Sequence, residues 1–144
     1  MDINSAKRLL EKENLTYVLF KDHEVHTGSG RGVKPLLSLI DSGKSYEGFS
    51  VVDKVVGKAA AFLYVILRVT TIHAEVVSRS ALQVLRDNEI AVTYDNLVEY
   101  IENRTKDGRC PMESAVIDIN DSSEALAAIC RKVEELNGER NKHE

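Results

Sequence analysis

Apolar and polar positions along the chain follow two periodicities, which predict strands and helices in alternation. Residues 15–20 are β-branched, aromatic and apolar on both alternating faces, which predicts a strand covered on both sides. The predicted strands are residues 15–20, 25–27, 70–77 and 90–94. The predicted helices are residues 6–13, 33–40, 54–67, 78–86, 95–103, 111–119 and 122–136.

The segment 54–67 is the centre of the predicted fold. Asp53 is a plausible N-cap, and the residues after it are apolar almost all round. A helix without a polar face is normally buried, and its small residues would let it lie close against a sheet. The strand–helix–strand unit that follows, over residues 70–94, is compact enough for a parallel pair with a right-handed crossover.

These elements predict one α/β domain over residues 1–138, with residues 139–144 as a solvated tail beyond a helix stop at Gly138. The length of 144 residues fits a single domain, and 43% hydrophobic with 29% charged residues is ordinary for a globular protein. The longest apolar run, residues 59–67, is far shorter than the roughly 20 residues that span a bilayer. A membrane is therefore not an expected partner.

The charge and the cysteine content limit the partners and the cellular compartment that we expect for this protein. The net charge is −4 and no basic stripe with interleaved aromatics occurs, so a nucleic acid polymer is not an expected partner. The N-terminus lacks a basic segment followed by an apolar stretch, so no secretory signal is expected. Cys110 and Cys130 are then expected as reduced thiols in the cytoplasm.

Three runs carry a resemblance to a known group of proteins: RGVKPLL at 31–37, DKVVGKAAA at 53–61 and CPME at 110–113. The chain resembles an uncharacterised microbial family, a domain of unknown function with a cytidine-deaminase-like fold that lacks the zinc deaminase signature. The resemblance extends from the first strand to the last helix. It implies a three-layer α/β/α sandwich with a mixed sheet, and it implies little about activity.

The tripeptide at 73–75 matches part of the sequence motif of a zinc deaminase site. Zinc deaminases use H-x-E with a later P-C-x-x-C, in which the His and both Cys hold the metal. Here His73 and Glu75 fall inside a strand pattern, and the helix after them has no cysteine. Zinc-dependent deamination, a metal site and any other cofactor are therefore not expected. The simpler interpretation is that these two side chains lie on a strand surface that faces solvent or another subunit.

Asp53, Lys54 and Lys58 form the first candidate site. On the predicted helix the two lysines lie four residues apart in the first turns, where like charges repel and the helix dipole disfavours cations. A bound phosphate or substrate carboxylate would relieve both penalties. The alternative is that Lys58 reaches the surface, or that acidic side chains pair with the lysines.

Two further segments are candidates for ligand contact. The glycine-rich run 28–32 could present backbone N–H groups and Arg31 to an anion, although a flexible turn explains the glycines equally well. Cys110 precedes Pro111, which predicts it as the N-cap of a helix, where the dipole stabilises a thiolate. Asn103 and Arg104 would then lie at the rim of a pocket with Cys110. The alternative is that Cys110 only caps and packs, with Glu113 completing a capping-box-like arrangement; Cys130 is expected in the core.

These features lead to three hypotheses from different classes. The favoured one is a non-zinc protein that binds a small anionic metabolite such as a nucleotide. Lys54 and Lys58 would bind its negative group and Asp53 a hydroxyl or amine, with Arg31 and Arg104 at the rim. The second is a hydrolase or transferase with Cys110 as its catalytic nucleophile. The third is a protein-interaction module with a vestigial pocket. The oligomeric state stays open, and a homo-oligomer is compatible with all three.

Overall fold

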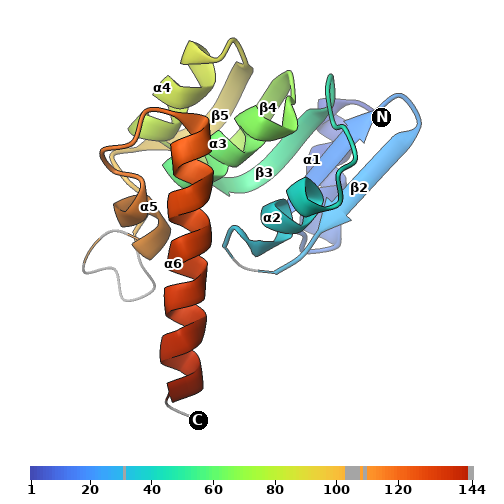
Figure 1. Cartoon of the computed structure of the whole chain (residues 1–144). Coiled ribbons are helices and arrows are strands. Elements are labelled where there is room, and N and C mark those ends of the chain that lie inside the picture. The colour runs from blue at the N-terminus through green and yellow to red at the C-terminus, as the bar shows by residue number, and fades with distance from the viewer. Residues whose placement is uncertain (31, 103–107, 109, 143–144) are drawn as a thin grey trace.

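A five-stranded mixed sheet forms the centre of the computed structural model, which describes residues 1–30, 32–102, 108 and 110–142. The strand order is β2-β1-β3-β4-β5 (Figure 1), with β1 antiparallel to both β2 and β3 and the remaining pairs parallel. The strands are β1 (Tyr17–Lys21), β2 (Glu24–Gly28), β3 (Ser50–Val56), β4 (Thr71–Ser78) and β5 (Ala91–Val98). The helices are α1 (Ile3–Lys12), α2 (Lys34–Asp41), α3 (Lys58–Leu67), α4 (Arg79–Asp87), α5 (Pro111–Ala115) and α6 (Ser122–Lys142).

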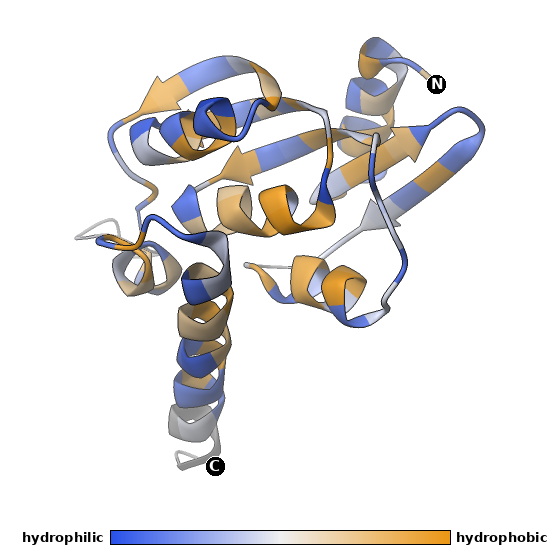
Figure 2. Cartoon of the chain, turned by 45° about the horizontal axis from the view of Figure 1, so that its top comes forward, coloured by the Kyte–Doolittle hydropathy of each residue, from blue (hydrophilic) through white to orange (hydrophobic). Residues whose placement is uncertain are grey.

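Helices cover both faces of the sheet, which confirms the predicted α/β sandwich. In Figure 1 α1 lies behind the sheet, and the other helices lie in front. The side chains of β1 alternate between two cores as predicted: Val18 and Phe20 pack with α1, whereas Tyr17 and Leu19 belong to the larger core around α3. Helix α3 is hydrophobic over most of its length (Figure 2), as expected of a helix buried in the body of the molecule.

The predicted helix start at Asp53 is wrong, because residues 50–56 form the central strand β3 and the helix begins at Lys58. Four valines at 51, 52, 55 and 56 favour extended backbone. The strand also gains hydrogen bonds on both sides, from β1 and from β4. Gly57, in an extended conformation, is the N-cap of α3 instead.

The predicted helix over residues 95–103 is also wrong at its beginning. Residues 95–98 continue β5, which pairs with β4 up to Ser78 and Val98. The parallel pairing over the whole of β4 outweighs the local capping signal at Asp95 and Asn96. The predicted parallel relation between β4 and β5, with α4 as their crossover, is confirmed.

Helix α6 differs from its prediction in two ways. It continues through Gly138 to Lys142, so the expected stop is wrong, and a glycine inside a helix costs only about 1 kcal/mol relative to alanine. Cys130 is exposed and not in the core. The buried stripe of α6 runs through Ala125, Ala128 and Ile129, and the next residue turns away by the helical angle. Among the helices of the described residues, none is both long and apolar enough to cross a membrane.

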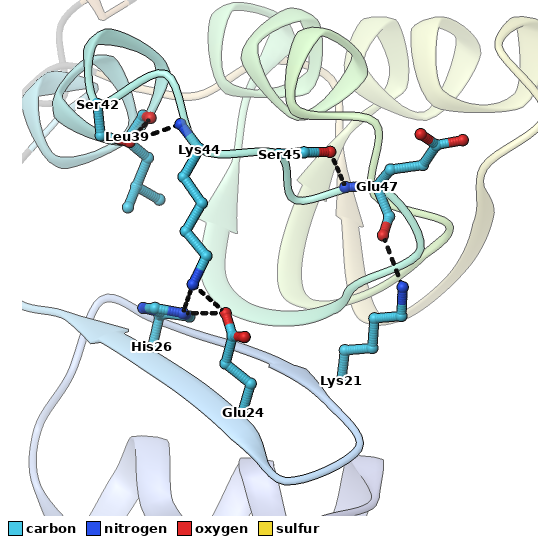
Figure 3. Close-up of polar contacts among 8 residues, drawn as sticks. All are labelled: Lys21, Glu24, His26, Leu39, Ser42, Lys44, Ser45 and Glu47. Atoms are coloured by element: carbon cyan, nitrogen blue, oxygen red, sulfur yellow. Dashed lines mark hydrogen bonds and ion pairs between the residues drawn. The ribbon is translucent and has the colours of Figure 1, made fainter.

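The connection from α2 to β3 is fastened to the sheet edge by polar contacts (Figure 3). Lys44 forms an ion pair with Glu24 on β2, and the same carboxylate lies 2.6 Å from Nε2 of His26. The His26 ring packs edge-on against Tyr46, with ring centroids 5.3 Å apart. These contacts hold the chain in position as it enters β3.

Candidate functional site

A cavity of about 330 Å³ opens where β1, β3, α2, α3 and α5 meet. Its wall is formed by the beginnings of β1, α2 and α3, the middle of β3 and the short helix α5. Most of the lining is apolar, from residues such as Val33, Leu36 and Met112. The polar groups are few, and two of them are buried carboxyl groups, those of Asp53 and Glu113.

Glu113 joins α5 to the beginning of α3. Its Oε2 accepts a hydrogen bond of 2.7 Å from the backbone N–H of Lys58, the first residue of α3. This places a carboxyl group at the positive end of the α3 dipole, where negative charge is favoured. The other oxygen, Oε1, is buried and has no hydrogen-bond partner among the described residues. Glu113 therefore lines the cavity and has one acceptor atom that is not used within the described residues.

Gly57 makes this contact sterically possible. A Cβ atom at position 57 would lie 2.6 Å from Oε1 and 2.8 Å from Cδ of Glu113, and 3.0 Å from Cγ1 of Ile101. Real Cβ atoms do not approach other atoms so closely. The backbone at Gly57 has φ −94°, which any residue can adopt, so the requirement for glycine is one of space.

Asp53 lies on the middle of β3 and is 3% exposed. Its Oδ2 accepts a hydrogen bond of 2.5 Å from the hydroxyl of Tyr64, and its Oδ1 accepts one of 3.1 Å from the N–H of Val55. Burial raises the pKa of Asp53 to about 7, although both hydrogen bonds act in the opposite direction. Burial also raises the pKa of Tyr64 well above its ordinary value. Asp53 can therefore gain or lose a proton near neutral pH.

The two lysines of the predicted anion site do not converge. Lys54 lies on β3, and its Nζ donates to Oδ1 of Asn14 at 2.6 Å. Lys58 is the first residue of α3, and its Nζ donates to the backbone carbonyl of Ile117 at 3.0 Å. Burial lowers the pKa of Lys58, while Asp118 and Glu113 raise it. The premise that both ammonium groups share a helix face and lack partners is wrong.

Cys110 is the N-cap of α5, with Pro111 after it, as predicted. It is partly buried and lines the cavity together with Asp53 and Glu113. No histidine is among the residues lining the described cavity. The capping-box-like role expected of Glu113 is wrong, because its carboxylate caps α3 in place of its own helix.

The remaining predicted residues lie elsewhere. Arg31, Asn103 and Arg104 are outside the described residues. His73 and Glu75 are on β4 and do not line the cavity. His73 is buried rather than wet, with Nδ1 2.7 Å from Oγ1 of Thr93 and Nε2 3.4 Å from Oδ1 of Asp95. In the described part of the chain, no three His, Cys, Asp or Glu residues are placed to hold a metal ion.

Comparison with known families agrees with this architecture. The family model described as a domain of unknown function, DUF1893, matches residues 5–133. The chain belongs to the DUF1893 family. It is also similar to the crystal structure of a DUF1893 family protein from Thermotoga maritima, with a TM-score of 0.84 and 27% identity over 92% of each chain. The resemblance stated from the three sequence runs is thus confirmed at the level of the family.

Two deaminases are similar at a lower level. The dCMP deaminase of cyanophage S-TIM5, in its apo form, has a TM-score of 0.47 and 10% identity, over 68% of this chain and 100% of that one. A diaminohydroxyphosphoribosylaminopyrimidine deaminase/5-amino-6-(5-phosphoribosylamino)uracil reductase from Thermotoga maritima has a TM-score of 0.42 and 13% identity, over 56% and 29%. The curated proteins contain no match to the chain.

Sequence reasoning missed two residues that shape the site. Tyr64 lies within the apolar segment 54–67, and its hydroxyl donates to Asp53 across the α3–β3 contact. Gly57 was interpreted as one small residue among several, and the structure requires it because of Glu113. No local pattern predicts the contact of Tyr64 with Asp53 or that of Gly57 with Glu113. Glu113 lies 55 positions from Lys58, its hydrogen-bond partner beside Gly57.

Proposed function

We propose that this DUF1893 protein binds a small metabolite in the cavity between β3, α2, α3 and α5. The observation that carries the proposal is that Glu113 lines the cavity and that its buried Oε1 has no hydrogen-bond partner in the described structure. A buried polar atom left unsatisfied costs roughly 1–3 kcal/mol. A ligand that donates a hydrogen bond there would recover that cost.

The size and composition of the cavity support the same function. A volume of about 330 Å³ is at the lower end of the range for small-molecule sites, which combine apolar walls with a few placed polar groups. Asp53 and Glu113 are such groups here. We place this function in the cytoplasm, and the free thiols of Cys110 and Cys130 support a reducing compartment.

The test compares a cavity-blocked variant with a matched control. Ala60 lines the cavity, so Ala60→Leu reduces its volume, whereas Ala127→Leu makes the same change at an exposed position of α6. A thermal-shift panel of amines, nucleobases, nucleosides, nucleotides and phosphorylated metabolites is measured on all three proteins. We expect a compound that raises the melting temperature of the wild type and of Ala127→Leu but not of Ala60→Leu.

Two results would count against metabolite binding. One is a panel in which no compound stabilises the wild type, with no small molecule retained in native mass spectrometry of the purified protein. The other is stabilisation that Ala60→Leu leaves unchanged, which would place the ligand outside this cavity. The first result would favour the protein-interaction module.

A further inference from the structure

We infer that the ligand presents N–H donors, as an amine, an amidine or an amino-substituted ring does, to Asp53 and Glu113, which both line this cavity. This inference rests on the proposed metabolite binding and names the chemical class of the ligand. It replaces the expectation of an anion that followed from the sequence.

The first argument is the arrangement of acceptors. Oε2 of Glu113 accepts the Lys58 N–H, whereas the buried Oε1 has no donor among the described residues. Asp53 lines the same cavity, and its carboxyl oxygens accept hydrogen bonds on the protein side from Tyr64 and Val55. Each ionised carboxylate oxygen still has a second lone pair. Two buried acceptor groups that line one cavity suit a head group with several N–H donors.

The second argument is that a carboxyl group already lies at the beginning of α3, where an anion would otherwise bind. N–H groups at a helix N-terminus commonly bind anions. The first N–H group of α3 already donates to Glu113. Lys54 lines the cavity, but its Nζ donates to Asn14, and the Nζ of Lys58 donates to Ile117; neither Asn14 nor Ile117 lines the cavity. A ligand carboxylate or phosphate near Oε1 would instead meet a carboxylate of the same sign.

The third argument concerns the rest of the ligand. Around the two carboxyl groups the wall is made of apolar side chains, among them Val33, Leu36, Val55 and Met112. Such a wall favours an aromatic or aliphatic body attached to the donor head. Asp53 titrates near neutral pH, so it can meet a cationic head as a carboxylate.

The experiment uses three probes of the same shape: benzamidinium, benzamide and benzoate. They share a planar ring and differ in a cationic donor head, a neutral donor head and an anionic acceptor head. Each is titrated into ¹⁵N-labelled full-length protein at pH 7.5, and the amide signals of Val55, Gly57 and Cys110 report on the cavity. We expect benzamidinium to bind at least about tenfold more tightly than benzoate, with benzamide between them, because hydrogen bonds to charged groups are stronger.

Variants at Glu113 test which group recognises the head. Glu113→Gln keeps an oxygen for the Lys58 N–H and removes the negative charge, so benzamidinium binding should weaken by about tenfold. Glu134→Gln removes a charge from an exposed position of α6 and should leave binding unchanged. If Glu113→Gln does not fold, the ranking of the three probes on the wild type still decides the question.

The outcomes separate this inference from the proposed function. If benzoate binds in the cavity as tightly as benzamidinium or more tightly, the donor class is wrong and metabolite binding stands. If Glu113→Gln binds benzamidinium as well as the wild type does, Glu113 does not recognise the head and the inference fails. If none of the probes shifts a cavity amide, both the donor class and the accessibility of the cavity are refuted.

Discussion

The carboxylate of Glu113 caps a helix to which it does not belong: its Oε2 accepts the N–H of Lys58 at 2.7 Å, across 55 residues of sequence. This hydrogen bond ties α5 to α3, the central helix of the larger core. Glu113→Ala should lower the free energy of unfolding by about 1–3 kcal/mol, because the Lys58 N–H is left buried without an acceptor. Glu113→Gln should cost less. Urea denaturation followed by circular dichroism measures both.

Glu134→Ala is the matched control for this prediction. Glu134 is exposed on α6, and its truncation should change the free energy of unfolding by less than about 0.5 kcal/mol. Equal effects of the two alanine variants would show that the cap contributes no stability.

Gly57 and Glu113 should be energetically coupled. A methyl group at position 57 would lie 2.6 Å from Oε1, so Gly57→Ala should displace the Glu113 side chain and destabilise the protein by about 1–3 kcal/mol. In Gly57→Ala, Glu113→Ala the obstructing carboxylate is gone, and the double variant should be more stable than the sum of the single effects predicts. A double-mutant cycle in urea measures this, and strict additivity would contradict the contact.

A substitution of Gly138 should stabilise the protein, in contrast to one of Gly57. Gly138 lies within α6, and a Cβ at this position would meet no atom within 4 Å. Gly138→Ala should therefore stabilise the protein by about 0.5–1 kcal/mol, because alanine loses less backbone entropy in a helix. An unchanged or lower thermal midpoint would indicate that this part of α6 is not helical in solution.

The parts of the fold that follow from local pattern were predictable. The hairpin of β1 and β2, the helix α2 and the crossover from β4 to β5 all appear where apolar periodicity places them. The central strand β3 was not predictable from local pattern. Its four valines are followed directly by the small and apolar residues of α3, so the whole stretch has the composition of one buried helix. Only the pairing with the neighbouring strands β1 and β4 decides between a strand and a helix here, and this pairing cannot be inferred from the local sequence.

The candidate site was predictable in its location and not in its chemistry. Asp53, Lys54 and Cys110 do line one cavity, as the run of candidates at 53–58 and 110–113 indicated. The expectation of an anion depended on a helical spacing of Lys54 and Lys58, and this spacing does not exist because residue 54 lies in β3. Lys54 and Lys58 donate to Asn14 and Ile117, and the buried carboxyl groups of Asp53 and Glu113 line the cavity beside Lys54.

The raised pKa of Asp53 predicts a pH dependence of stability with a definite sign. In the folded state Asp53 holds a proton up to about pH 7, whereas in the unfolded state its carboxyl group releases the proton near its ordinary pKa of 3.8. Between these values folding takes up a proton, so the free energy of unfolding falls as the pH rises, by at most about 1.4 kcal/mol per pH unit. Above the window this contribution stays lost and the curve is flat.

Asp53→Asn isolates this effect. The stability of the wild type relative to Asp53→Asn should decline from pH 5 to pH 7 and then level off, as measured by urea denaturation at a series of pH values. Asp41→Asn, at the exposed end of α2, serves as the matched control, and the difference should be small there. A wild-type advantage over Asp53→Asn that does not change with pH would mean that Asp53 is ionised throughout.

The two cysteines report separately on cavity occupancy. Cys130 is exposed on α6, whereas Cys110 is partly buried and lines the cavity. Iodoacetamide should therefore modify Cys130 faster, and benzamidinium at ten times its dissociation constant should slow Cys110 by about tenfold without affecting Cys130. Peptide mass spectrometry over a time course measures both rates in the same sample. Unprotected Cys110 in the presence of a bound probe would place that probe elsewhere, and modification of Cys110 ahead of the exposed Cys130 would favour the nucleophilic enzyme over a simple binding protein.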